Sequence, residues 1–154
     1  MTITGTEFTA ATKVGFGQTN AVEFTVNSPT SIIAVAPAAT AGTVDVNVTN
    51  TVGTSANSTS DRFKYVPVVE GVTPNTGSTL GGTSVTVAGS GFTPGSTATA
   101  FNFGKVKAKS VNCTSTTTCI VSAPPQVAGT VDVKATVNKT SSAINAPGDR
   151  FSYS

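Results

Sequence analysis

The chain repeats itself, and this repeat constrains the fold more than any other feature. The residues from Ala41 to Val46 recur unchanged from Ala128 to Val133, 87 positions further along. The segment from Asp61 to Tyr65 recurs from Asp149 to Tyr153 with one substitution, at an offset of 88. Because repeats at a fixed period are copies of one structural unit, the 154 residues predict two domains of the same fold.

The first copy starts later in the repeat than the second. Residues 1–5 align with residues 85–89 at an offset of 84, and nothing in the first copy corresponds to 67–84. We therefore predict repeat one over 1–66, without its opening strand, and a complete repeat two over 67–154. On this alignment Met1 is expected to be a cloning start inside a longer array. A missing strand exposes a sheet edge, so repeat one is expected to favour strand addition and self-association.

The local pattern predicts β-strands. Val44, Val46 and Val48 alternate with polar residues, as in a strand with one buried face. Charged residues make up only 10% of the chain and hydrophobic residues 38%, which is typical of β-sandwiches and not of disordered chains. The strands expected in repeat two, which has no predicted helix, are 68–73, 84–89, 97–103, 106–111, 118–122, 130–138 and 149–153. The predicted fold class is all-β, two tandem immunoglobulin-like antiparallel β-sandwiches.

A series of motifs in repeat two carries a family resemblance. They are PVVEGVTP at 67–74, GGT at 81–83, GSGF at 89–92, FG at 103–104, GTVDV at 129–133 and FSY at 151–153. In this order they resemble the IPT/TIG family of immunoglobulin-like domains. Repeat one departs from the pattern at Glu7, where the family usually has glycine. The resemblance implies the fold, but the family occurs in bacterial surface and adhesion proteins, secreted carbohydrate-active enzymes, receptor ectodomains and transcription factors, so it does not imply one function.

The residues needed for catalysis and metal binding are scarce. The chain has no histidine, the commonest general base and zinc ligand, and its seven carboxylates mostly recur in both copies. We therefore expect no enzyme activity, no cofactor and no metal. Asp61 and Asp149 precede the last strand of each repeat, where a carboxylate can accept backbone N–H bonds from a turn. The alternative role for them is calcium binding, although no Asp-x-Asp run is present.

The two cysteines lie close together in the sequence. Cys113 and Cys119 flank five residues, and their repeat-one counterparts are the apolar pair Val26 and Ile32. We predict a disulfide between two strands near the core, with two packed free thiols as the alternative. A disulfide implies an oxidising compartment, so the predicted location is extracellular or at the cell surface.

A short lysine stripe is the one candidate interaction surface. Lys105, Lys107 and Lys109 alternate with apolar residues and are predicted to leave one face of one strand. The stripe either discourages edge pairing or binds an anion. The net charge of +2 and the absence of a cationic cluster argue against nucleic acid, and no apolar run is long enough for membrane insertion.

These features favour a non-catalytic extracellular spacer or adhesion module of a cell-surface or secreted repeat protein. The residues around Val66 and Pro67 contain no flexible glycine or serine linker, so the two repeats are expected to form a semi-rigid rod. The alternative function is an accessory or carbohydrate-recognition domain attached to a secreted enzyme. A DNA-binding role would need basic loops that the sequence lacks.

Overall fold

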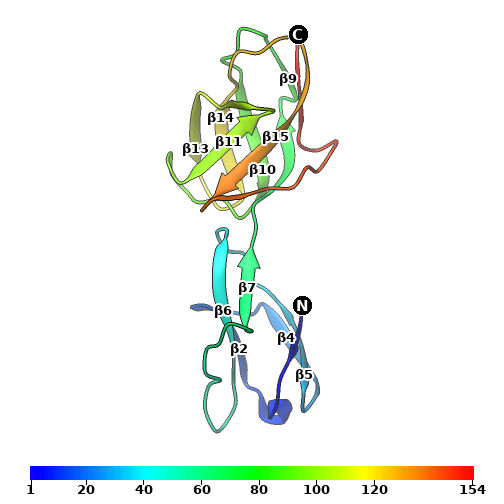
Figure 1. The fold of residues 1–154 in the computed structure, drawn as a ribbon, viewed down its shortest axis with the longest axis vertical. Helices are drawn as coiled ribbons and strands as arrows, with labels where there is room; N and C mark the ends of the chain where they lie inside the picture. Colours follow the sequence, from blue (N-terminus) through cyan, green and yellow to red (C-terminus); the bar gives the residue numbers. More distant parts are fainter. The chain divides into compact units, whose positions relative to one another are not determined.

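The structure is a computed structural model that describes residues 1–154. The chain divides into two compact units, and each is a β-sandwich (Figure 1). Unit 1 contains Met1–Pro37 and Thr43–Lys64, and unit 2 contains Ala38–Gly42 and Tyr65–Ser154. The all-β, immunoglobulin-like fold expected from the sequence is confirmed.

Unit 2 is built from two facing sheets. The first has the order β13-β14-β10-β8, formed by Ser110–Cys113, Thr118–Ser122, Ser84–Ser90 and Val68–Thr73. The second has the order β12-β11-β15-β17-β9, formed by Val106–Lys107, Thr99–Phe103, Gly129–Val137, Arg150–Tyr153 and Thr76–Gly77. A two-residue strand, β16 (Thr140–Ser141), pairs with β15. All pairings are antiparallel except β9 with β17, which is parallel.

The alternation in the sequence explains how these sheets enclose a core. Along β10, Val85 and Val87 point inward and are fully buried, while Thr86 and Ala88 are exposed. Phe101, Phe103 and Phe151 add large side chains from the facing sheet, and all three are fully buried. Because the longer strands of both sheets each present an apolar face, the two sheets can close over a continuous hydrophobic core.

Unit 1 repeats most of this arrangement. One sheet has the order β1-β5-β4, formed by Thr2–Thr4, Ser31–Val35 and Glu23–Ser28. The other has the order β3-β2-β6-β7, formed by Thr19–Asn20, Lys13–Phe16, Gly42–Thr49 and Arg62–Tyr65. A single 3-10 turn, Phe8–Ala10, is the only helical element.

The strand registers confirm the alignment of the two copies. Ile3 pairs with Ile32 in unit 1, and the aligned residues Val87 and Cys119 pair in unit 2. In unit 2 the other side of β10 pairs with β8, whereas β1 in unit 1 pairs only with β5. Within residues 1–154, no strand pairs with β1 on the side where β10 pairs with β8 in unit 2.

One predicted strand of repeat two is wrong. The segment 106–111 is not one strand, because β12 pairs with β11 in one sheet while β13 pairs with β14 in the other. The crossing lies at two residues: the Ala108 N–H donates to the Phe101 carbonyl, and the Lys109 N–H donates to the Ser122 carbonyl. Ala108 is buried at this crossing, so the apolar residue that suggested a strand instead anchors the change of sheet.

The structure contains no helix with the length and apolar character needed to cross a membrane.

Candidate functional site

The open edge of β1 is the most distinctive surface of unit 1. The Met1 amino group donates to the Ala34 carbonyl at 2.7 Å, and the Ala34 N–H donates to the Met1 carbonyl at 2.9 Å. The Gly5 N–H donates to the Thr30 carbonyl at 3.1 Å. In an antiparallel ladder the residues that bond to one neighbour alternate with residues that face away from it. The N–H and C=O groups of Thr2 and Thr4 therefore face away from β5, and we call this side the β1 edge.

A cavity of about 250 Å³ lies beside the β1 edge. We call it the edge cavity. It is formed between β1 and the segment that leads into β7, and its apolar surface comes from Ile3 and Val46. Its lining residues are Met1, Thr2, Ile3, Thr4, Val46, Ser58, Ser60, Asp61 and Arg62.

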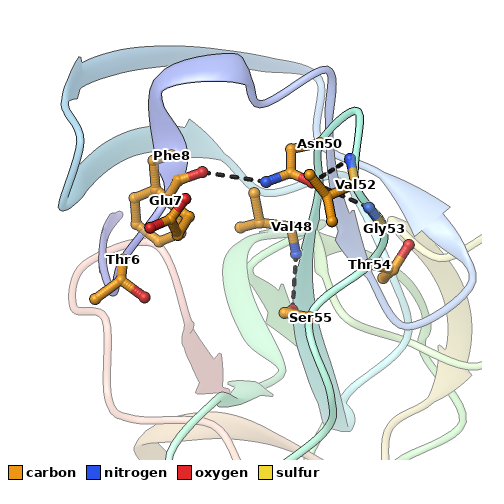
Figure 2. A pocket seen from close by; sticks show the side chains of 9 residues that line it. All are labelled: Thr6, Glu7, Phe8, Val48, Asn50, Val52, Gly53, Thr54 and Ser55. Atoms are coloured by element: carbon orange, nitrogen blue, oxygen red, sulfur yellow. Dashed lines mark hydrogen bonds between the residues drawn. The ribbon is translucent and has the colours of Figure 1, made fainter.

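A second cavity, of about 460 Å³, lies in the same unit (Figure 2). We call it the loop cavity. Phe8 and Val48 supply its apolar surface, and a turn after β6 forms the opposite wall. Its lining residues are Thr6, Glu7, Phe8, Val48, Asn50, Val52, Gly53, Thr54 and Ser55.

Hydrogen bonds of the Asn50 side chain connect the walls of the loop cavity. Its side-chain amide donates to the Glu7 carbonyl at 3.2 Å, and its side-chain oxygen accepts the N–H groups of Val52 and Gly53 at 2.9 and 3.1 Å (Figure 2). The Val48 N–H donates to the Ser55 hydroxyl at 3.1 Å. The cavity is therefore bounded by a turn with defined geometry and not by loose side chains.

The carboxylates that recur in both copies have structural partners. Asp61 accepts the Ser58 N–H and Asp149 accepts the Asn145 N–H, each at 2.7 Å, which is the predicted turn-capping role. The outward-facing Asp45 and Asp132 lie 4.0 and 3.9 Å from Arg62 and Arg150 on the neighbouring strand. No group of three or more potential metal ligands comes together.

The structure joins the two cysteines that the sequence singled out. Cys113 and Cys119 form a disulfide across β13 and β14, and both are buried in the core of unit 2. Their counterparts Val26 and Ile32 are likewise a cross-strand pair, between β4 and β5. The disulfide in unit 2 therefore replaces an apolar cross-strand contact of unit 1.

The three lysines of the predicted stripe do not lie on one strand. Lys107 is in β12, while Lys105 is in the preceding turn and Lys109 is at the crossing to the other sheet. All three are exposed. Their role as an interaction stripe stays a prediction.

The aromatic side chains face the cores of the two units. Each of the eight phenylalanines and two tyrosines is buried or partly buried, so none forms a fully exposed stacking surface. Burial raises the pKa of both Tyr65 and Tyr153, and for Tyr153 a hydrogen bond with Gln126 partly offsets this effect. Both phenol groups are therefore neutral at physiological pH.

Sequence reasoning did not locate the two cavities. Neither contains a motif, because the residues that line them are ordinary for this fold. The one available signal was the lack of a counterpart to 67–84, which predicted an open edge but not the hollows beside it.

The comparisons agree with the geometry. Two consecutive sandwiches with matching registers define a tandem of immunoglobulin-like modules. The IPT/TIG domain model matches residues 1–65 and 67–153, and the chain belongs to this family. Comparison with curated proteins finds no match.

Two solved structures from Bacteroides resemble the chain at low identity. One is SGBP-B from a complex xyloglucan utilization locus in Bacteroides uniformis, with 16% identity and a TM-score of 0.42 over 96% of this chain and 44% of that one. The other is SGBP-B from a Bacteroides ovatus mixed-linkage glucan utilization locus, in complex with a mixed-linkage heptasaccharide. Its identity is 12% and its TM-score 0.45, over 99% of this chain and 40% of that one. The chain thus spans less than half the length of either structure.

Proposed function

We propose that the chain is a non-catalytic spacer or adhesion module of a cell-surface or secreted repeat protein. The observation that carries this proposal is the succession of two IPT/TIG repeats with only Val66 between the matched segments. Pro67 has a fixed φ and restricts Val66 to extended backbone, which supports a semi-rigid junction between repeats over 1–66 and 67–154. A spacer needs such a junction, because a flexible linker would not hold a distal binding domain at a defined distance.

The chemistry of the chain supports the remaining parts of the proposal. The Cys113–Cys119 disulfide fits an oxidising compartment, hence an extracellular or cell-surface location. The chain lacks histidine, the commonest general base in hydrolysis and group transfer. The proposed partner is another protein or a surface, and the low net charge of +2 gives no support to nucleic acid.

The alternative is an accessory or carbohydrate-recognition domain beside a secreted enzyme. Sugar rings are commonly bound by stacking on exposed aromatic side chains, and here all ten aromatic side chains are buried or partly buried. This observation favours the spacer or adhesion role.

The test compares the chain with a variant that carries Gly-Gly-Ser inserted between Val66 and Pro67. Small-angle scattering and residual dipolar couplings are measured on both proteins. A spacer predicts a narrow distribution of interdomain angles for the parent and a broad one for the insertion variant. Equally broad distributions in the two proteins would contradict the proposal, and specific retention on a polysaccharide gel would favour the accessory-domain alternative.

A further inference from the structure

The outward face of the second sheet of unit 2 carries a row of three polar side chains. Asn102 in β11 lies directly opposite Lys107 in β12 and directly opposite Lys134 in β15, and β11 and β15 lie side by side in Figure 1. Directly opposed residues of antiparallel strands point to the same face of the sheet. Lys107 is exposed, and Asn102 and Lys134 are half-buried. We call these three residues the cationic row.

The side chains of the cationic row have no partner within the chain. The two ion pairs of the protein join other residues, and the Asn102 side chain makes no hydrogen bond. Neighbouring strands are about 4.8 Å apart, so the α-carbons of Lys107 and Lys134, which lie on either side of β11, are about 10 Å apart. The row therefore presents two free ammonium groups and one amide donor to solvent, all within reach of one bound chain.

The charges around the row favour an anionic partner. Unit 2 carries six Lys or Arg against three Asp or Glu, a net charge of +3, whereas unit 1 carries three against four, a net charge of −1. Of the three acids of unit 2, Asp149 is fully buried and Glu70 belongs to the other sheet. Asp132 is the one carboxylate on the face of the row, and Arg150 lies 3.9 Å from it. The face thus has an excess of positive charge.

The same three positions of unit 1 carry no charge. Their pairing is unchanged, with Gly15 opposite both Asn20 and Asn47. A side chain at Gly15 would meet the Asn47 side-chain oxygen, so the place of Asn102 is closed in unit 1. Because the sheet of unit 1 forms with asparagine at both lysine positions, the two lysines of unit 2 are not needed to build the fold.

We propose that the cationic row is a docking site for an extended, acidic segment of a partner protein. The segment runs along the row and crosses β12, β11 and β15. Side chains two residues apart on one face of an extended chain are about 7 Å apart, and the flexible lysine stems close the remaining difference. Two carboxylates of the segment accept hydrogen bonds from Lys107 and Lys134, and the Asn102 amide donates to the backbone carbonyl between them.

The surroundings of the row favour a peptide over other polyanions. The residues beside it, Ala100, Thr136 and Ser141, are small and form a flat surface that a peptide backbone can approach. Anionic membranes are bound by clusters of about 4 to 8 Lys or Arg, and nucleic acids by extended basic patches. Sugar rings are commonly bound by exposed aromatic side chains, and all ten aromatic side chains here are buried or partly buried.

This proposal rests on the adhesion part of the proposed function, because it names the kind of partner that adhesion requires. The spacer part needs no ligand. The substitutions below leave Val66 and Pro67 unchanged, so the interdomain angles measured by scattering test the spacer separately from the row.

The test uses the full chain and a fluorescent peptide of alternating glutamate and serine. Binding is followed by fluorescence anisotropy, and the site is located by NMR shift changes of the Asn102 side-chain amide. A control peptide carries glutamine in place of every glutamate. We expect saturable binding of the acidic peptide with a shift of the Asn102 amide, no binding of the control peptide, and weaker binding at high salt, because salt screens exposed charges.

Matched variants separate the row from general charge. Lys107→Asn combined with Lys134→Asn copies the residues of unit 1 and should weaken binding by at least about tenfold. Lys107→Arg combined with Lys134→Arg keeps both charges and should bind within about twofold of the parent. Lys13→Asn combined with Lys64→Asn is the control, since it removes the same charge from two exposed positions of unit 1, on β2 and β7. It should change binding by less than about twofold.

Other outcomes overturn the proposal. Failure of the acidic peptide to bind, or binding without a shift of the Asn102 amide, would show that the row is not the site. Equal weakening by the two pairs of Lys→Asn substitutions would show that binding follows net charge and not the row. Tighter binding of polygalacturonate than of the peptide at equal carboxylate concentration would assign the row to an acidic polysaccharide instead of a protein.

Discussion

Val87 in unit 2 and Ile3 in unit 1 occupy the same place in the same strand ladder, yet Val87 is 0% exposed and Ile3 is partly exposed. The neighbouring pair differs more, since Val85 is fully buried and Met1 is 47% exposed. The strands on the far side of both residues are equivalent, so the difference lies with β8. An opening strand in this fold therefore acts mainly as a cover for the core that the other strands have already built.

The two units also differ in how they join the strands at the other edge of the same sheet. Unit 2 links β13 and β14 by a disulfide, and unit 1 joins β4 and β5 by the contact between Val26 and Ile32. Ile32 is fully buried, as is Cys119. The site is thus a core position in both units, and the covalent bond adds to a contact that already packs well.

The largest expected difference is the stability of the two units. Burying Val69 and Val72 contributes about 1.5 to 3 kcal/mol each and the disulfide about 2 kcal/mol. Unit 2 should therefore exceed unit 1 by about 5 to 8 kcal/mol in free energy of opening. Native-state hydrogen exchange compares the most protected amides of β6 with those of β15. Equal protection of the two strands in a dilute monomer would mean that unit 1 is not an incomplete sandwich.

The aromatic pair that recurs in both units should show the next largest difference. Phe103 and Phe151 meet edge to face at 5.2 Å in unit 2, and Phe16 and Phe63 do so at 5.3 Å in unit 1. Phe151 is fully buried, whereas Phe63 is partly exposed. Phe151→Ala should cost about 3 to 5 kcal/mol and Phe63→Ala about 2 kcal/mol. Denaturant unfolding followed by exchange in each unit measures both, and equal costs would show that unit 1 encloses its core as well as unit 2.

Removing the disulfide should lower the stability of unit 2 by about 2 kcal/mol. The variant combines Cys113→Val with Cys119→Ile and so copies the pair found in unit 1. The reduced parent protein is the matched control, because it loses the bond without a change of side chains. Thiol titration of the unfolded, unreduced parent should find no free thiol. Two thiols per chain would mean that Cys113 and Cys119 do not form a disulfide.

Much of this comparison could be predicted from the sequence, because repeated residues carry the same structural role twice. The recurrence of Asp61 as Asp149 indicated a turn cap, and the alignment of residues 1–5 with 85–89 matched β1 to β10 of repeat two. The same comparison placed the cysteine pair near the core, since its counterparts Val26 and Ile32 are apolar. A weak sequence pattern in one copy of a repeat can be checked at the aligned positions of the other copy.

The features that sequence reasoning missed depend on tertiary contacts. Alternating residues over 106–111 look like one strand, although the chain changes sheet at Ala108. Strands of two residues, such as β9 and β16, are too short to show a period. The cavities reflect side chains that lack a neighbour, and a sequence gives no direct sign of a missing contact.

A buried hydroxyl should distinguish the units by about 1 kcal/mol. Ser142 accepts the Ala135 N–H at 3.1 Å and is buried, whereas its counterpart Ser55 accepts the Val48 N–H at 3.1 Å in an exposed position. Ser142→Ala leaves a buried N–H without its acceptor and should cost about 1.5 kcal/mol, against about 0.5 kcal/mol for Ser55→Ala. The exposed Ser141→Ala serves as the control. The urea midpoint of each unit measures the loss of stability caused by each substitution. A larger loss for Ser55→Ala than for Ser142→Ala would mean that the core of unit 1 is the better enclosed of the two.

The smallest expected difference concerns the ion pairs across the last two strands of each unit. Arg62 with Asp45 and Arg150 with Asp132 have almost the same separation, and their side chains are 59% and 38% exposed in unit 1 and 57% and 33% exposed in unit 2. Exposed pairs of this kind are strongly screened by solvent and salt. Asp45→Asn and Asp132→Asn should therefore each change stability by less than about 0.5 kcal/mol. Urea unfolding at low and high salt measures both changes. The prediction is contradicted if Asp132→Asn lowers stability more than Asp45→Asn does and the excess disappears at high salt. In that case electrostatics, as well as the burial provided by β8, would contribute to the stability difference between the units.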